Sequence, residues 1–548
     1  MSRSVALAAL FAVLLVSSSS TATAELTGIV FVDANGNGTR DHGELGRAGI
    51  AVSNGRDVVR TNVYGRYRLP ERPGYVALTC PDQFDCPLRY REGAGDFPLE
   101  AAPNEGGFFF IQVSDVEALE DIADFAGFSS SAPRWLPGNL SDWLVLRDLR
   151  RTFGMEDDVL AGRLRATLAR YRNVEGLSNV EVVGAYFDEV FEPGRELGRT
   201  ADAARDSMAE IAALGPAFVI STGDMVLAEP RASPAAIAAR LRFYREITEA
   251  TGIPFYNTIG HNEITVAESP RPTAGAPQHG KDLFRRFHGP THYSFDRGNF
   301  HFVALDTHHP ESNRSGTERW GVTKLDPDVR HWLDADLAEH PNMVHVALNH
   351  EPFHSSLDGT EEYNRADDEG LFAKHEVRYS LAGHIHRNGF ERRNGTTHIT
   401  TGALSGSQWL LPADLHERGY RLFYARDGDL YHAWKRTGEA LVAFLAPQQP
   451  RLREGVFLAV AVDRYGPFAK IEVSIDDEPA PFERWGDYFL RISLPYAFQE
   501  LVLTATRENG EFVRAKLAPG SPDSTPASGR ADGLTPRSSR EPDRPELP

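Results

Sequence analysis

The stretch Tyr379-Ser380-Leu381-Ala382-Gly383-His384-Ile385-His386 decides the fold, because a short apolar run leads directly into two histidines. Such a run is typical of a buried strand, so both histidines follow its carboxyl end. Three upstream runs end in the same manner: residues 217–220 precede Gly223-Asp224, residues 254–257 precede Gly260-His261-Asn262-Glu263, and residues 344–347 precede Asn349-His350. Open α/β sheets bind ligands beyond the carboxyl ends of their strands. The sequence therefore predicts an α/β fold whose strand ends gather Asp and His into a metal centre.

This ordered set of blocks resembles the calcineurin-like metallophosphoesterases, whose pattern runs D-x-H, G-D, G-N-H-[DE], H and G-H-x-H. The resemblance covers roughly residues 106–405, and the flanking segments are similar to those of bacterial members with N- and C-terminal β domains. It implies an αββα sandwich flanked by two small all-β domains. It also implies two divalent metal ions of the Mn, Fe or Zn class that hydrolyse phosphate mono- or diesters.

The first metal takes its ligands from the first block, which departs from the family pattern. Asp115 and Glu117 follow an apolar strand, with Glu117 where the family has His, and His386 completes the set. A carboxylate there suits Mn²⁺, Mg²⁺ and partly Fe. This placement requires a largely helical insertion over about 118–199. The alternative block at 182–187 lies at the usual distance but lacks both ligands, and the plainer alternative is that Asp115 caps a helix.

The second metal takes His350 and His384, and Asp224 bridges the two metals in the resemblance. The third block is reordered, because His261-Asn262 stands where the family has Asn followed by His. By position, His261 becomes a ligand and Asn262 replaces the catalytic imidazole, a loss of about 10²–10⁴ in rate. Alternatively the loop shifts by one residue, so that Asn262 binds metal and His261 protonates the leaving group.

Glu263 orients either residue of that block, so the predicted catalytic group is His261, Asn262 and Glu263. The sequence does not fix the roles of two further groups of residues near the predicted site. His308 and His309 follow a strand end and are candidates for substrate contact. Four acidic residues are expected in a solvated loop, namely Glu351, Asp358, Glu361 and Glu362.

Strand-and-turn patterning over 25–105 predicts an N-terminal β-sandwich, and similar patterning over 406–517 predicts a C-terminal β domain. The first contains a calcium-loop pattern with oxygen ligands Asp33, Asn35, Asn37, Thr39, Asp41 and Glu44. An Asx-rich turn without metal is the alternative. The chain has two cysteines, Cys80 and Cys86, which we expect to form a disulfide in an oxidising compartment.

Residues 1–24 read as a cleaved signal peptide, which predicts a periplasmic or secreted protein, and their apolar stretch is too short to span a bilayer. We therefore expect no transmembrane segment. The formal charge of −19 argues against a nucleic-acid platform, which needs a basic surface. Residues 518–548 are rich in Pro, Ser, Arg and Asp and are predicted to be disordered. The sequence does not fix the oligomeric state.

Two functional hypotheses follow. The first is a secreted metal-dependent phosphoesterase that acts on a phosphate-ester substrate at a dinuclear centre. The second is a catalytically impaired, metal-binding pseudoenzyme or surface-binding protein that acts through its β modules. Glu117 and the reordered His261-Asn262 pair motivate the second hypothesis, and the site rather than the fold must decide between them.

Overall fold

A computed structural model describes residues 24–102, 106–118, 200–227, 234–264, 280–309, 322–323, 325–353, 366–406, 417–445, 456–493 and 498–517. The predicted signal peptide, the helical insertion and the disordered tail lie outside the described residues, apart from residues 24 and 118 at their borders. The alternative first block at 182–187 also lies outside them. Where the chain is described, no helix is both long and apolar enough to cross a membrane.

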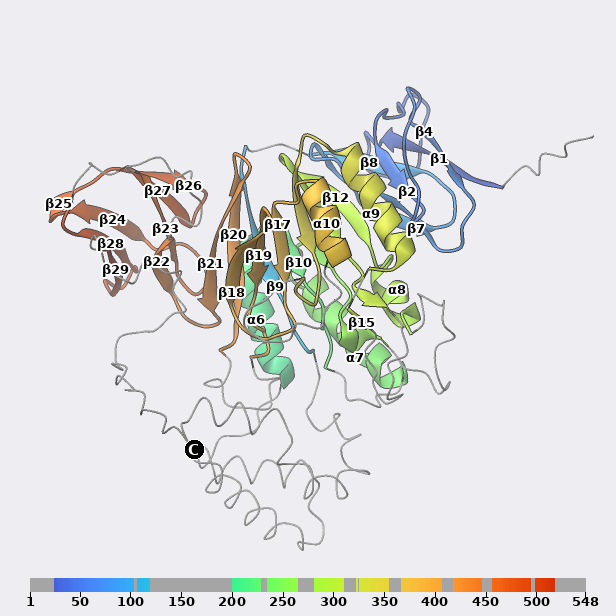
Figure 1. Cartoon of the computed structure of the whole chain (residues 1–548). Helices are drawn as coiled ribbons and strands as arrows, with labels where there is room; N and C mark the ends of the chain where they lie inside the picture. The colour runs from blue at the N-terminus through green and yellow to red at the C-terminus, as the bar shows by residue number, and fades with distance from the viewer. Residues whose placement is uncertain are drawn as a thin grey trace, which may run out of the picture.

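The first sheet at the centre of the molecule has the order β11-β10-β9-β20-β21 (Figure 1). The strands are β9 (Phe108–Val113), β10 (Val219–Ser221), β11 (Phe255–Asn257), β20 (Gly419–Arg426) and β21 (Asp429–Arg436). Strands β9, β10 and β11 are parallel, whereas β20 is antiparallel to β9. The apolar run that forms β9 thus lies in the middle of the sheet, in keeping with a strand covered on both faces. Three helices accompany this sheet: α6 (Thr200–Ala213), α7 (Pro234–Glu249) and α8 (Asp282–His288).

The second sheet has the order β12-β13-β16-β17-β19-β18. Its strands are β12 (Tyr293–Arg297), β13 (Phe300–Ala304), β16 (Val344–Leu348), β17 (Tyr379–Ala382), β18 (Gly389–Arg393) and β19 (Thr396–Thr400). The four inner strands are parallel, and each edge strand is antiparallel to its neighbour. Helices α9 (Pro327–Glu339) and α10 (Ala366–Lys374) accompany it, and the short pair β14 (His308–His309) and β15 (Val322–Thr323) follows β13.

Aromatic rings from both sheets form the core between them. Phe110 of β9 stacks on Phe423 at 4.7 Å and on Phe218 at 5.0 Å, and it meets Phe302 of β13 edge to face at 5.7 Å. Helices cover each outer face. Trp332 and Leu333 of α9 are among the side chains that pack on the second sheet. The result is a helix–sheet–sheet–helix arrangement, which confirms the predicted mixed α/β class.

Two four-stranded sheets precede the sandwich. One has the order β4-β1-β8-β6 and the other β3-β2-β5-β7. Their strands are β1 (Glu25–Val32), β2 (Ala51–Ser53), β3 (Val58–Arg60), β4 (Arg66–Pro70), β5 (Tyr75–Leu78), β6 (Phe84–Asp85), β7 (Tyr90–Glu92) and β8 (Phe97–Ala101). Cys80 and Cys86 form a disulfide, as predicted. The Cys80 carbonyl accepts a hydrogen bond of 2.8 Å from Asp296 N, and this bond ties these sheets to β12.

Two further four-stranded sheets follow the sandwich, on the opposite side from β1–β8 (Figure 1). Their strands are β22 (Leu441–Leu445), β23 (Val456–Val462), β24 (Lys470–Ile475), β25 (Glu478–Pro479), β26 (Phe482–Trp485), β27 (Phe489–Ser493), β28 (Leu501–Thr506) and β29 (Phe512–Leu517). One correction concerns β20 and β21, which the sequence assigned to the C-terminal β domain. β20 pairs instead with β9 in the first sheet, and β21 pairs with β20, because β9 offers an open edge that strand patterning alone could not reveal.

Candidate metal centre

The strand ends of both sheets meet at one place. In the first sheet, Thr222 N donates to Val113 O at 3.0 Å and Asp115 N donates to Gly223 O at 3.1 Å, so the segments that follow β9 and β10 run side by side. In the second sheet, Gly383 N donates to His350 O at 3.0 Å. The two sheets are joined here, since His384 N donates to Asp115 Oδ2 at 3.0 Å. The topology therefore brings together the blocks that the sequence separates by more than 250 residues.

Five of the predicted metal ligands have a left-handed backbone. Their φ angles are 48° for Asp115, 47° for Glu117, 49° for Asp224, 69° for His384 and 54° for His386. Residues other than glycine adopt such angles uncommonly, and each carries a conformational cost that the surrounding fold must offset. Because this strain is concentrated on the predicted ligands, it supports a functional role for the cluster.

Two of the motif glycines are required by close approach. A Cβ atom on Gly383 would lie 1.6 Å from Ser114 Oγ and 2.6 Å from Asp115 Oδ2. A Cβ atom on Gly260 would lie 2.2 Å from Asp224 N. Any side chain at either position would push the strand ends apart, which explains the glycine before each histidine.

The predicted second-metal ligands converge on one carboxylate oxygen. Asp224 Oδ2 lies 3.2 Å from Nε2 of His261 and 3.2 Å from Nε2 of His350. His384 Nδ1 lies 3.3 Å from the same His350 nitrogen. His350 Nδ1 contacts Thr222 O at 2.8 Å, an arrangement that fixes the ring and leaves Nε2 directed at the cluster. Buried groups gathered in this way can share a divalent cation.

The predicted first-metal ligands form a second group beside it. His386 Nε2 lies 3.3 Å from Asp115 Oδ1 and 3.9 Å from Glu117 Oε1. Both of these carboxylate oxygens are buried and accept no hydrogen bond from any described residue. The other Glu117 oxygen accepts a bond of 2.7 Å from Ser405 Oγ. Orphaned buried carboxylate oxygens are costly unless a cation satisfies them, so these residues fit a metal ion.

The electrostatics of the cluster point the same way. Burial raises the pKa of Glu117 to about 8, which reflects a carboxylate without enough positive charge nearby. Burial alone would lower the pKa of His386, but Asp115 and Glu117 outweigh it and raise that pKa to about 10. For Asp224, His261 and His350 overcome burial and lower the pKa. Glu117 is thus the carboxylate of this cluster that lacks a sufficient cationic partner, a role that a divalent metal can fill.

The reordered third block forms a single helical turn, residues His261–Glu263. His261 directs Nε2 at Asp224, as a ligand would, whereas Asn262 donates its backbone N–H to Asp224 Oδ1 at 2.9 Å. Glu263 accepts bonds from Gly260 N at 2.7 Å and from Asp224 N at 3.1 Å. Of the two predicted arrangements, this geometry favours the one in which His261 binds metal and Glu263 holds the loop.

Glu351 is the site residue that sequence reasoning missed. We expected a solvated loop, but Glu351 is buried, and its carboxylate contacts His308 Nε2 and accepts a bond of 2.5 Å from Thr307 Oγ1. Its carboxylate, His261, His350 and His384 offer ligand atoms within 4.8 Å of one another. Its position directly after His350 was the available signal. Asp358, Glu361 and Glu362 lie outside the described residues, as does the His309 side chain.

A buried amide beneath the cluster links its two halves. Gln112 of β9 donates from Nε2 to Thr222 Oγ1 and to Ala382 O, both at 3.1 Å, and accepts a bond from Thr401 Oγ1 at 2.8 Å. Thr222 and Ala382 each precede a predicted ligand, Asp224 and His384, by two residues. Gln112 therefore fixes the spacing between the strand ends of the two sheets.

The predicted calcium loop is closed by its own side chains. Asp33 accepts bonds from Gly36 N and Gly38 N at 2.8 and 2.7 Å. Glu44 accepts bonds of 2.9 Å from Ala34 N and Asp41 N. Asn35 and Asn37 both donate to Asp41 Oδ2, and Asn37 accepts from Thr39 N. All six predicted residues thus belong to one compact loop, Thr39 through its backbone N–H.

Comparison with known proteins gives structural likeness alone. No protein-family model and no curated sequence matches the chain. Similar solved structures include a dimetal phosphatase from Danio rerio, with 13% identity over 65% of this chain and 96% of that one and a TM-score of 0.34. A purple acid phosphatase from yellow lupin seeds has 13% identity over 76% and 67%, with a TM-score of 0.33. An anchor of the inner membrane complex of Plasmodium has 12% identity over 61% and 85%, with a TM-score of 0.28. Such values carry no argument about activity, so we base function on this chain's own side chains.

Proposed function

We propose that this chain is an exported, metal-dependent phosphoesterase of the calcineurin-like class, which hydrolyses phosphate mono- or diesters at a dinuclear centre. Export rests on the signal-like residues 1–24. The observation that carries the proposed activity is the pair of orphaned buried oxygens, Asp115 Oδ1 and Glu117 Oε1, beside the Asp224 group. A fold that buries unsatisfied carboxylates at its strand ends, at the cost of strained backbone, gains most when cations occupy them.

The residues divide into two sets. Asp115, Glu117 and His386 would hold the first cation, and His261, His350 and His384 the second, with Asp224 shared between them. When bound, two divalent cations supply Lewis-acid activation of the phosphate ester and of the attacking water.

The side chains around the centre orient the proposed metal ligands and leave the third block without a proton donor. Glu263 fixes the turn that presents His261, and Ser114 donates to Asp115 Oδ2 at 2.6 Å and so sets that carboxylate's rotation. Asn262 stands where an imidazole would protonate the leaving oxygen, and its amide has no acidic proton to give. The leaving oxygen therefore takes its proton from solvent, which favours esters with acidic leaving groups.

A specific observation keeps the second candidate function in view. Because His261 is directed at Asp224 as a ligand, no imidazole of the third block remains as an acid catalyst. A metal-bearing binding protein, acting through the β sheets on either side of the sandwich, would need the cations but no turnover. The two functions differ in one measurable quantity, the catalytic rate of the metal-loaded protein.

The test is hydrolysis of bis- and mono-(4-nitrophenyl) phosphate by the purified chain loaded with Mn²⁺. We expect turnover by the native sequence and a loss of about 10³-fold or more in Asp224→Asn, because that change removes the shared carboxylate. Asp427→Asn is the matched control, since Asp427 has the same left-handed backbone, with φ of 52°, on an exposed turn. Stoichiometric metal without turnover would establish the binding-protein alternative instead.

A structural calcium ion in the loop of residues 33–44 is a separate part of the proposal. Support comes from the complete spacing of oxygen ligands and from the burial of Asp33 and Glu44. We expect millimolar Ca²⁺ to raise the melting temperature, and Glu44→Gln to abolish that rise while leaving nitrophenyl phosphate turnover intact. If Ca²⁺ does not change the melting temperature, the loop is an Asx-rich turn without metal.

A further inference from the structure

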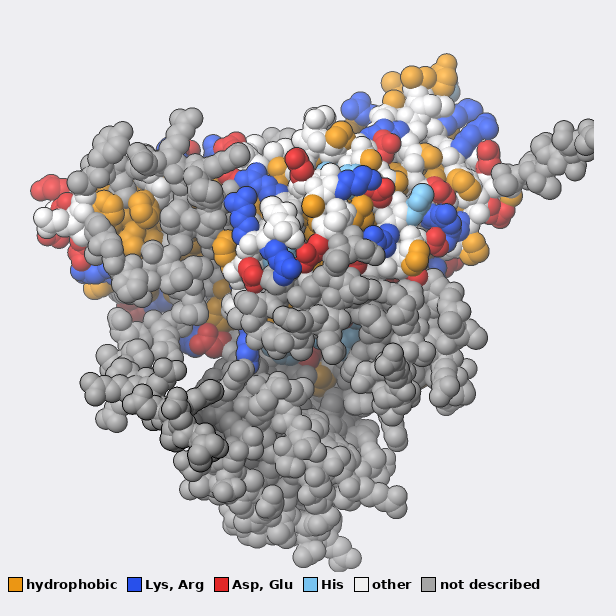
Figure 2. All heavy atoms as spheres, viewed as in Figure 1, with side chains coloured by type: hydrophobic (Ala, Val, Ile, Leu, Met, Phe, Trp, Pro, Cys, Tyr) orange, Lys and Arg blue, Asp and Glu red, His pale blue; other side chains and the backbone are white. Residues whose placement is uncertain are grey.

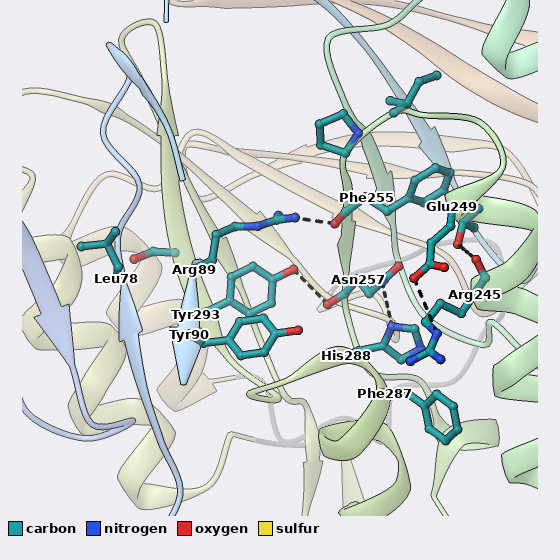
Figure 3. Close-up of a pocket in the computed structure, with 14 residues that line it drawn as sticks. Leu78, Arg89, Tyr90, Arg245, Glu249, Phe255, Asn257, Phe287, His288 and Tyr293 are labelled. Atoms are coloured by element: carbon teal, nitrogen blue, oxygen red, sulfur yellow. Dashed lines mark hydrogen bonds and ion pairs between the residues drawn. The ribbon is translucent and has the colours of Figure 1, made fainter. Parts of the chain in front are cut away.

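A cavity of about 270 Å³ lies at the seam between the N-terminal β sheets and the first sheet of the sandwich (Figure 3). Its walls come from the segment around β7, the edge strands β11 and β12, the end of α7 and the end of α8. None of the predicted metal ligands lines it. Ligand pockets usually measure about 300–1,000 Å³, so this one suits a ligand with a single ring.

Arg89 places a cation without a counter-ion on the wall of this cavity. Its guanidinium lies 4.3 Å from the centre of the Tyr256 ring, and Nη1 reaches Phe255 O at 3.4 Å. Within the described part of the chain, no carboxylate pairs with it. A half-buried guanidinium held by one tyrosine and one carbonyl retains donors for a planar anion, and a bidentate carboxylate is the partner that fits its geometry best.

Two tyrosines supply a flat wall beside Arg89. Tyr293 donates its hydroxyl to Asn257 O at 3.1 Å, which fixes the ring against the edge strand. The Tyr90 hydroxyl extends toward the side of the cavity that holds Asn257 and His288, as Figure 3 shows. Flat apolar rings beside a cation are the surroundings that an aromatic anion requires. The ring of the ligand packs on one wall, and its charge pairs with the cation on another.

The opposite wall carries an acid–base pair. Arg245 Nε lies 3.6 Å from Glu249 Oε1, and both side chains are exposed, by 47% and 72%. The Glu249 carboxylate also lines the cavity, so it repels an incoming anion as well as neutralising Arg245. Arg89 is therefore the cation that an anionic ligand would meet without competition.

We propose that this seam cavity binds a small aromatic carboxylate, with the carboxylate on Arg89 and the ring against Tyr90 and Tyr293. Such binding is additional to the proposed phosphoesterase activity. Because the ligand would contact both the N-terminal sheets and the sandwich, its occupancy stabilises the seam between them.

The test is titration calorimetry of the full-length, metal-loaded chain with benzoate, and with benzamide as the uncharged isostere. We expect benzoate to bind at least about ten-fold more tightly than benzamide, because only benzoate pairs with the guanidinium. Arg89→Gln removes this preference, and Glu249→Gln tightens benzoate binding about two- to five-fold by removing a competing charge. Arg66→Gln, an exposed change on β4, is the control and leaves both ligands unaffected.

Three results overturn the proposal. The first is no benzoate binding at benzoate concentrations up to ten times about 1 mM. The second is equal affinity for benzoate and benzamide, and the third is benzoate binding that is unchanged in Arg89→Gln. The last result identifies a carboxylate bound elsewhere, including at the metal centre. If Arg89→Gln does not fold, Glu249→Gln decides alone, since tighter binding supports the proposal and unchanged or weaker binding refutes it.

Discussion

Two buried clusters of His and carboxylate residues lie in the described part of the chain, and their chemistry differs although their composition is similar. The strand-end cluster contains the predicted metal ligands around Asp115 and Asp224. The His301 cluster comprises Asp296, His301, Asp336 and His340, and lies where β12 and β13 meet α9. The surface view in Figure 2 shows acidic and basic side chains mixed over the described part of one face.

In the His301 cluster, the protein satisfies its own charges. His301 Nδ1 lies 2.7 Å from Asp296 Oδ1, and Nε2 lies 2.9 Å from Asp336 Oδ2, so neither nitrogen is left for a metal. Ser294 Oγ donates to the other Asp336 oxygen at 3.1 Å. The strand-end cluster instead leaves two buried carboxylate oxygens without donors. Between these two clusters, the difference therefore lies in the unsatisfied carboxylate oxygens and not in the residue types.

The largest effect should come from removing the cation of the His301 cluster. His301→Gln leaves Asp296 and Asp336 buried with weaker partners, so we expect the free energy of unfolding to fall by about 3–5 kcal/mol. Metal stoichiometry should stay unchanged. Urea unfolding and elemental analysis measure the two quantities, and His331→Gln on the exposed side of α9 is the control. If the variant kept its stability but lost metal, the His301 cluster would bind metal, and the contrast between the two clusters would be wrong.

The same cluster predicts a pH dependence. Burial alone would lower the pKa of His301, but Asp336 and Asp296 outweigh it and raise that pKa to about 9, against 6.5 for the ordinary group. The folded state therefore holds the proton more tightly, so the stabilisation is complete below pH 6.5 and is lost as pH rises through 9. Urea unfolding from pH 6 to 10 should show the gap between native sequence and His301→Gln narrowing. A constant gap would mean that His301 is uncharged in the fold.

The sequence predicted that these residues gather at the strand ends, because each follows a strand by a few residues, and their role as metal ligands stays a prediction. The runs that became β9, β10, β11, β16 and β17 are short and apolar, and parallel pairing then places their ends at one edge. The Cys80–Cys86 disulfide was equally local, since the two cysteines are six positions apart in the sequence. Local patterns with a fixed geometric consequence can therefore be predicted from the sequence.

Other features depended on pairing partners that no local pattern specifies. β20 and β21 read as part of a separate β domain, yet β20 pairs with β9 across about 310 residues of sequence and β21 pairs with β20. Glu351 read as a loop acid because its burial depends on His308 and Thr307 from another strand end. The His301 cluster was not predicted at all, since it joins residues of two strands and a helix.

A third prediction concerns whether the strand-end cluster is catalytic as well as metal-binding. Asn262→His places an imidazole where the family pattern has one, so we expect rates on alkyl phosphates to rise by about 10–100-fold. Rates on nitrophenyl esters should change little, because their leaving groups need no proton. The slope of log rate against leaving-group pKa measures this, with Asn509→His on a distant exposed turn as the control. An unaltered slope would show that position 262 does not face the leaving group.

The smallest expected effect concerns the first-metal group, where Glu117 replaces the His of the family pattern. Glu117→His exchanges an oxygen ligand for a nitrogen ligand, so the ratio of Zn²⁺ to Mn²⁺ affinity should rise by about ten-fold. Competition dialysis with elemental analysis measures this ratio, and Glu472→His on an exposed strand is the matched control. If the ratio stays the same while stoichiometry is preserved, Glu117 does not contact metal. The contrast between the two clusters would then rest on the unsatisfied oxygen of Asp115 alone.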